Sequence, residues 1–94
     1  MFFITTVQIS GDKDIRCVGY YSKFKDAERV VMENLGDIFE YCYEYAVIEN
    51  ISEGIYQYDF EPKWYFMDYE KDEVRKIEKP DLEELKGFCW CGVG

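Results

Sequence analysis

Residues 15–35 decide the fold, and they read IRCVGYYSKFKDAERVVMENL. The first part, Ile15 to Tyr21, has the apolar and aromatic content of a strand. After Ser22, apolar side chains recur at helical spacing, which predicts a helix from about Lys23 to Leu35 that packs on a sheet. The apolar positions are Phe24, Ala27, Val31 and Leu35, with Val30 widening the stripe. Ser22 is the predicted N-cap of this helix and Gly36 its predicted C-cap.

Upstream of this stretch, Phe2 to Ile9 predicts a first strand, which pairs antiparallel with Ile15–Tyr21 through the polar turn at 10–14. Apolar side chains point to both sides of this first strand, and this predicts a central strand that is buried on both faces or partly covered. Four more strands are predicted downstream. They cover Tyr45–Ile51, Lys63–Tyr69, Val74–Glu78 and Phe88–Val93.

Short helical turns are predicted at Ile38–Tyr43 and Leu82–Lys86. The first of them has an alternative, a single long helix running through Gly36, which the glycine would destabilise by about 1 kcal/mol. A break or kink at Gly36 is the favoured pattern. The sequence therefore predicts an α+β fold, an antiparallel sheet of five to six strands with one main helix, about 23–35, packed on one face.

The composition predicts one soluble domain. The chain has 94 residues, of which 48% are hydrophobic, and this is enough for a single domain, 1–94, with its own core. No apolar run approaches the roughly 18 residues of a membrane span. The opening residues, Met-Phe-Phe-Ile-Thr-Thr-Val, lack the basic segment and long apolar run of a signal peptide. We therefore expect no membrane partner and a cytoplasmic location.

The chain lacks the residue patterns of the common catalytic, cofactor and metal sites. Histidine is absent, which removes the commonest general base and the usual partner of a nucleophile. No glycine-rich loop opens a helix to bind phosphate. The cysteines Cys17, Cys42, Cys89 and Cys91 are predicted to be free, buried thiols, because zinc needs four suitably spaced ligands. We therefore expect a protein that is not an enzyme and that holds no cofactor or metal.

The net charge of −9 is concentrated in the middle of the chain, where residues 30–62 hold eight Asp or Glu and no Lys or Arg. Such a field repels nucleic acid and attracts basic proteins. Four of these acids would follow one side of a helical path at intervals of about 5–6 Å, which resembles the spacing of phosphates. They are Glu33, Asp37, Glu40 and Glu44. The alternative is an ordinary solvated helix face.

Tyr56 and Tyr58 lie in a predicted irregular segment, and exposed tyrosines beside carboxylates are typical of protein interfaces. Together with the four acids they form the predicted partner-binding surface, which fits a basic host protein that itself binds nucleic acid. Direct binding of nucleic acid by this chain is not expected, since it lacks a basic stripe. Two alternatives stay open. One is a small-molecule or nucleotide pocket lined by Trp64, Tyr65 and Phe66, and the other is a self-associating module, including a homodimer, that closes a sheet edge.

Several segments together resemble a family of small hypothetical proteins from Gram-positive gut bacteria and their phages or mobile elements. The resemblance rests on Phe3-Ile4-Thr5-Thr6, Arg16-Cys17-Val18-Gly19-Tyr20-Tyr21-Ser22, Phe24, Ala27-Glu28, Val31, Tyr45-Ala46-Val47-Ile48-Glu49 and the Trp64 strand. It brings no activity and no functional residue. It implies an accessory protein of a mobile element, so the expected function is to bind and inhibit, or modulate, a basic host defence protein.

Overall fold

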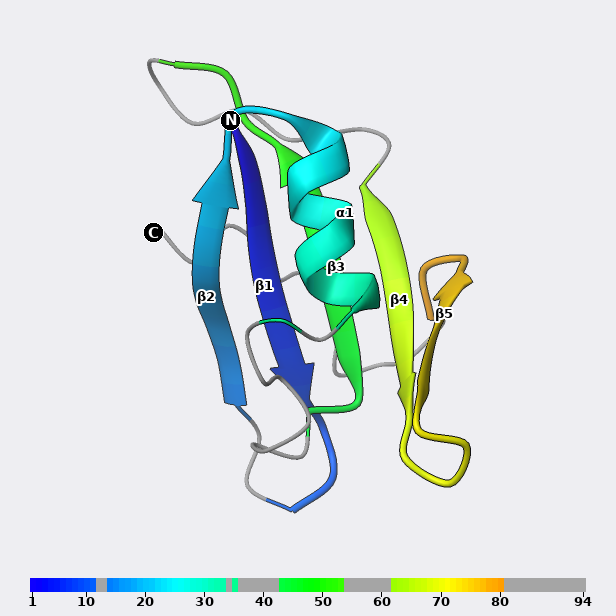
Figure 1. The fold of residues 1–94 in the computed structure, drawn as a ribbon. Helices are drawn as coiled ribbons and strands as arrows, with labels where there is room; N and C mark the ends of the chain where they lie inside the picture. The colour runs from blue at the N-terminus through cyan, green and yellow to red at the C-terminus, as the bar shows by residue number, and fades with distance from the viewer. Residues whose placement is uncertain (12–13, 34, 36–42, 54–61, 81–94) are drawn as a thin grey trace.

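The computed structural model describes residues 1–11, 14–33, 35, 43–53 and 62–80. These residues form one five-stranded antiparallel sheet, in the order β2-β1-β3-β4-β5, with the helix α1 packed on one face (Figure 1). The elements are β1 Phe2–Gln8, β2 Asp14–Tyr21, α1 Phe24–Met32, β3 Tyr45–Asn50, β4 Lys63–Asp68 and β5 Glu73–Ile77. The α+β prediction is confirmed. The predicted strand at 88–93 and helical turn at 82–86 lie outside the described residues, as does the turn at 38–43 except for Tyr43.

The first strand is central, as its two-sided apolar pattern predicts. β1 pairs with β2 on one side and with β3 on the other. Ile4 is buried in the cluster beneath α1, whereas Val7 is buried on the opposite face together with Val47 and Trp64. Because successive side chains of a strand point to opposite faces, β1 contributes to the apolar packing on both sides of the sheet.

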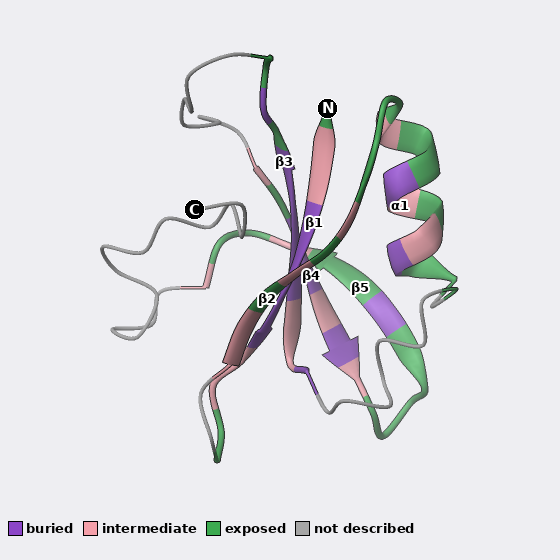
Figure 2. Ribbon diagram, turned by 90° about the vertical axis from the view of Figure 1, so that its left-hand side faces the viewer, coloured by how far each residue is buried: buried purple, intermediate pink, exposed green. Residues whose placement is uncertain are grey.

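Helix α1 packs on the sheet through Ala27 and Val31, neither of which is exposed. Figure 2 shows these buried positions on the side of the helix that faces the strands. Phe24 is half-buried and meets the ring of Phe2 edge to face, with the ring centroids 5.7 Å apart. The predicted stripe is therefore correct over the first two turns. No helix within the described residues is long and apolar enough to cross a membrane.

The helix starts within one residue of its predicted start, but both predicted caps and the predicted C-terminal end are wrong. Lys23 is the N-cap in place of Ser22, and it makes no capping hydrogen bond through its side chain. The helix ends at Met32, with Glu33 as C-cap, and the Leu35 N–H donates to the Val30 carbonyl at 3.0 Å. This bond is typical of a Schellman motif, which closes a helix before the chain turns away. Leu35 therefore lies past the helix, 57% exposed, and does not pack on the sheet.

Candidate functional site

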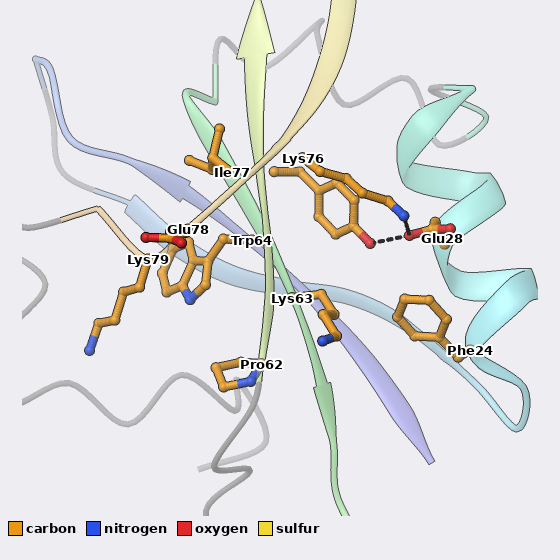
Figure 3. A pocket seen from close by; sticks show the side chains of 10 residues that line it. Phe24, Glu28, Pro62, Lys63, Trp64, Lys76, Ile77, Glu78 and Lys79 are labelled. Carbon is orange, nitrogen blue, oxygen red and sulfur yellow. Dashed lines mark hydrogen bonds and ion pairs between the residues drawn. The ribbon is translucent and has the colours of Figure 1, made fainter.

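An open pocket of about 770 Å³ lies where the start of β4 and the end of β5 meet the first half of α1 (Figure 3). Its volume is within the range of roughly 300–1,000 Å³ that is usual for small-molecule sites. The apolar part of its lining consists of Phe24, Pro62, Trp64, Tyr65 and Ile77. The charged part consists of Glu28, Lys63, Lys76, Glu78 and Lys79. Aromatic walls with a few charged groups are the usual composition of a ligand site.

The register of β4 and β5 explains why these side chains meet. Trp64 is opposite Ile77, and Tyr65 is opposite Lys76. Since side chains alternate between the faces, the first pair lies on the face away from α1 and the second pair lies under the helix. The pocket sits at the end of the two strands and so takes side chains from both faces of the sheet.

A hydrogen-bonded group joins α1, β4 and β5 in one wall of the pocket. The Tyr65 hydroxyl donates to Glu28 Oε2 at 2.6 Å, and Lys76 Nζ lies 3.1 Å from the same oxygen (Figure 3). Tyr65 has no exposed surface. The Glu28 carboxylate, which comes from the helix, therefore holds one residue of each neighbouring strand in a fixed position.

The protonation states of this group follow from its contacts. Burial and the hydrogen bond to Glu28 raise the pKa of Tyr65 far above its ordinary value of 10.0. Burial opposes ionisation of Glu28, but hydrogen bonds from Tyr65 and Lys76 and the charges of Lys76 and Lys63 outweigh it. The pKa of Glu28 is therefore below its ordinary value of 4.5. At neutral pH the tyrosine is protonated and the carboxylate is ionised, with Lys76 compensating its charge.

The pocket is locally basic in an acidic protein. Three lysines and two glutamates line it, whereas the whole chain has a net charge of −9. Lys76 is engaged by Glu28, and Lys63 makes no ion pair with any residue that the structure describes. Lys63 is also exposed. Its ammonium group is therefore accessible to an anion that enters beside the aromatic walls.

Two of the three aromatic residues that the sequence predicts to line a pocket do line this one. Trp64 and Tyr65 line the pocket, whereas Phe66 does not, because it lies further along β4. The Phe66 ring packs against Tyr45 at 5.8 Å, and the guanidinium of Arg75 lies 5.2 Å from its centroid. Phe66 is therefore not part of the lining of this pocket.

The four predicted acids do not share one helical path, because α1 ends at Met32. Glu33 caps the helix and pairs with Arg29 at 2.7 Å, with 55% of its side chain exposed. Glu44 precedes β3, and its Oε1 accepts hydrogen bonds from the Ile9 N–H, the Ser10 N–H and the Ser10 hydroxyl. Asp37, Glu40, Tyr56 and Tyr58 lie outside the described residues. The partner surface therefore stays a prediction.

The structure describes one of the four cysteines and several of the tyrosines. Cys17 is a half-buried free thiol, and Cys42, Cys89 and Cys91 lie outside the described residues. The described ranges contain no cluster of three or more side chains suited to a metal ion. Tyr43 is 2% exposed and belongs to the cluster under α1.

The charged residues of the pocket were missed by sequence reasoning. Glu28, Lys63 and Lys76 come from three elements, so no local motif joins them. The local signal is a lysine, Lys63, between a proline and the two aromatic residues Trp64 and Tyr65. Comparisons of the chain with protein-family models, with curated proteins and with solved structures found no match.

Proposed function

We propose that the protein is a binding module for a small anionic ligand that carries an aromatic or other flat apolar group. The pocket at the ends of β4 and β5 is the proposed site. The observation that carries the proposal is the position of Lys63 and its neighbouring lysines beside the aromatic walls of a pocket of ligand size. Such a pocket satisfies a carboxylate, sulfonate or phosphate with ammonium groups and buries the rest of the ligand against apolar surface.

The residues that line the pocket have separate proposed roles. Lys63 is proposed to contact the anion, since it is exposed and unpaired among the described residues. Phe24, which is only half-buried, is proposed to contact the apolar part of the ligand. Tyr65 is a positioning residue. Its hydroxyl holds the Glu28 carboxylate in place, where Lys76 compensates the negative charge. Without that compensation, Glu28 would repel an anion.

Two fluorescent probes of matched shape test the proposal. 8-Anilinonaphthalene-1-sulfonate is anionic, and N-phenyl-1-naphthylamine has the same rings without the sulfonate. We expect the anionic probe to bind more tightly, and Lys63→Gln to weaken it about tenfold, the value of one charge-assisted hydrogen bond. The neutral probe should be insensitive to this change.

Lys71→Gln is the matched control, because Lys71 is exposed in the turn between β4 and β5 and does not line the pocket. An equal loss of affinity for the anionic probe in both variants would show that the net charge of the protein, and not the pocket, governs binding. Equal affinity of the parent for the two probes would also contradict an anion site.

A second proposal keeps the acidic residues as a partner surface. Glu33 supports it, because more than half of its side chain is exposed beyond the end of α1. The proposed partner is a basic, nucleic-acid-binding host protein whose cationic groove would accept the carboxylates. On this proposal the chain acts as an inhibitor or modulator carried by a phage or mobile element.

Glu44 has to be left out of the corresponding test, because its carboxylate holds Ile9 and Ser10. Reversal of Glu33, Asp37 and Glu40 to Lys should abolish capture of a host protein that duplex DNA displaces. Reversal of three exposed acids near the β4–β5 turn, Glu70, Asp72 and Glu73, is the control with the same change in charge. Unchanged capture by the first variant, or equal loss in both, would contradict the proposal.

A further inference from the structure

The edge strand β2 exposes apolar side chains, whereas the opposite edge of the sheet does not. Val18 is 46% exposed and Tyr20 is 61% exposed, and both lie on the outermost strand at that side of the described sheet. At the other edge, β5 exposes Glu73, Arg75 and Lys76, with its apolar Val74 buried. Charged side chains are the common device that prevents a sheet edge from pairing with another strand. Among the described residues, β5 has this protection and most of β2 lacks it.

The β2 edge is also locally neutral. Its two charged residues, Asp14 and Arg16, form an ion pair with a distance of 3.5 Å, and the five residues after Arg16 carry no charge. In a chain with a net charge of −9, the acidic surfaces of two copies repel each other on approach. This edge can approach its own counterpart without that repulsion.

A bulge in β2 gives the strand a register that suits pairing with itself. Ile4 is opposite Gly19 and Thr5 is opposite Cys17, so Val18 is the additional residue. As a result Ile15, opposite Val7, and Tyr20, opposite Phe3, lie on the same face of the sheet. Antiparallel strands place residues of the same face opposite each other. A two-fold pairing can therefore oppose Ile15 of each copy to Tyr20 of the other.

We propose that β2 pairs antiparallel with β2 of a second copy, forming a two-fold dimer with a continuous sheet. The occupant is a second copy because an antiparallel pair of identical strands is complementary to itself under a two-fold axis. Tyr20 is already held in place for this contact, since its ring packs on Phe3 at 5.5 Å. The bulge at Val18 interrupts the new ladder, so the dimer is expected to dissociate on dilution.

Sedimentation equilibrium of the full chain tests the proposal. The mass of the parent should rise with concentration from 11.3 kDa toward twice that value. Tyr20→Lys and, independently, Val18→Lys should remain monomeric, while their thermal unfolding and circular dichroism stay close to those of the parent. Leu35→Lys is the matched control, because Leu35 is a comparably exposed apolar residue outside β2 and should leave dimerisation unchanged.

Disulfide trapping tests the register. The double variant Ile15→Cys, Tyr20→Cys should form a covalent dimer through those two positions under mild oxidation, as mapped by mass spectrometry, and Ile15→Cys alone should not do so through position 15. A parent that stays monomeric up to millimolar concentration would overturn the proposal. So would a dimer that survives both lysine substitutions, a dimer that Leu35→Lys disrupts equally, or trapping in a different register.

Discussion

Replacement of Glu44 gives the sharpest test of the structure, because it separates a structural carboxylate from a surface charge. Its Oε1 accepts three hydrogen bonds, at 2.8 Å from the Ile9 N–H and at 2.7 Å from both the N–H and the hydroxyl of Ser10. The bonds span 34 or 35 residues and join the end of β1 to the residue before β3. We therefore expect Glu44→Ala to destabilise the contact between these two strands.

The magnitude follows from what each donor can do without Glu44. Ser10 is exposed, so water replaces the carboxylate at its two donors, whereas the bond from the Ile9 N–H is partly buried. Removing a charged acceptor from a partly buried donor costs about 2 kcal/mol. In a domain of this size that corresponds to a fall in Tm of about 8–16 °C. Glu44→Gln keeps an oxygen acceptor but loses the charge, and should cost about half as much.

The pH dependence gives a second, independent measurement. Burial opposes ionisation of Glu44, but the hydrogen bonds from Ser10 and Ile9 outweigh it and hold the pKa of that carboxyl below its ordinary value of 4.5. A lowered folded-state pKa adds stability that is fully present above the unfolded pKa and is lost as pH falls through the folded pKa. The difference in unfolding free energy between the parent and Glu44→Gln should therefore be constant near neutrality and shrink below about pH 4.5.

Urea unfolding of the parent, Glu44→Ala, Glu44→Gln and Glu33→Ala at several pH values is the assay. Glu33 is the control, because its exposed ion pair with Arg29 is worth only about 0.3–0.5 kcal/mol. If Glu44→Ala unfolds within about 0.5 kcal/mol of Glu33→Ala, the structural role of Glu44 is refuted. The same result would mean that Glu44, like Glu33, can be replaced with little effect on the fold.

Three further predictions concern the core, the pocket wall and the thiols. Val31→Asp places an unpaired charge under α1 and should lower the unfolding free energy by about 3–5 kcal/mol. The exposed control Lys25→Asp should change it by no more than about 0.5 kcal/mol. An unchanged Tm for Val31→Asp would contradict the helix placement. Tyr65→Phe should lower the unfolding free energy by about 1 kcal/mol and raise the pKa of Glu28, which carboxyl NMR titration can measure. An unchanged pKa of Glu28 would exclude the hydrogen bond from the Tyr65 hydroxyl. A thiol reagent should modify the native protein slowly and the denatured protein rapidly, and stoichiometric zinc in the purified protein would contradict free cysteines.

The strands were predictable because their signals are local. Alternating apolar residues bounded by polar turns placed all five described strands within one residue of their ends. The end of the helix was not predictable in this way, because it depends on a backbone hydrogen bond from Leu35 to Val30 that no side-chain pattern announces. Leu35 has the correct spacing for the stripe, but the chain has already left the helix when it reaches that position.

The candidate site depended on contacts that the sequence does not encode locally. Trp64 and Tyr65 were named as pocket residues from their aromatic character alone. Glu28 joins them because the packing of α1 on the sheet brings its carboxylate to the Tyr65 hydroxyl, and Lys76 joins them through the β4–β5 register. The structural role of Glu44 also depends on contacts that the local sequence does not encode. In the sequence it is one acid among eight, and only the pairing of β1 with β3 gives its carboxylate three donors.

The distribution of charge favours a small anion over a nucleic acid as the ligand of the pocket. The described residues contain twelve Asp or Glu and nine Lys or Arg, so they account for only −3 of the net charge of −9. At physiological salt the field of exposed charges decays over about 8 Å, so an anion inside the pocket responds mainly to the lysines that line it. A nucleic acid extends far beyond that distance and responds to the net charge of the whole chain, −9. If the proposed function is correct, added salt should weaken binding of a small anion to the pocket only modestly, because few charges take part.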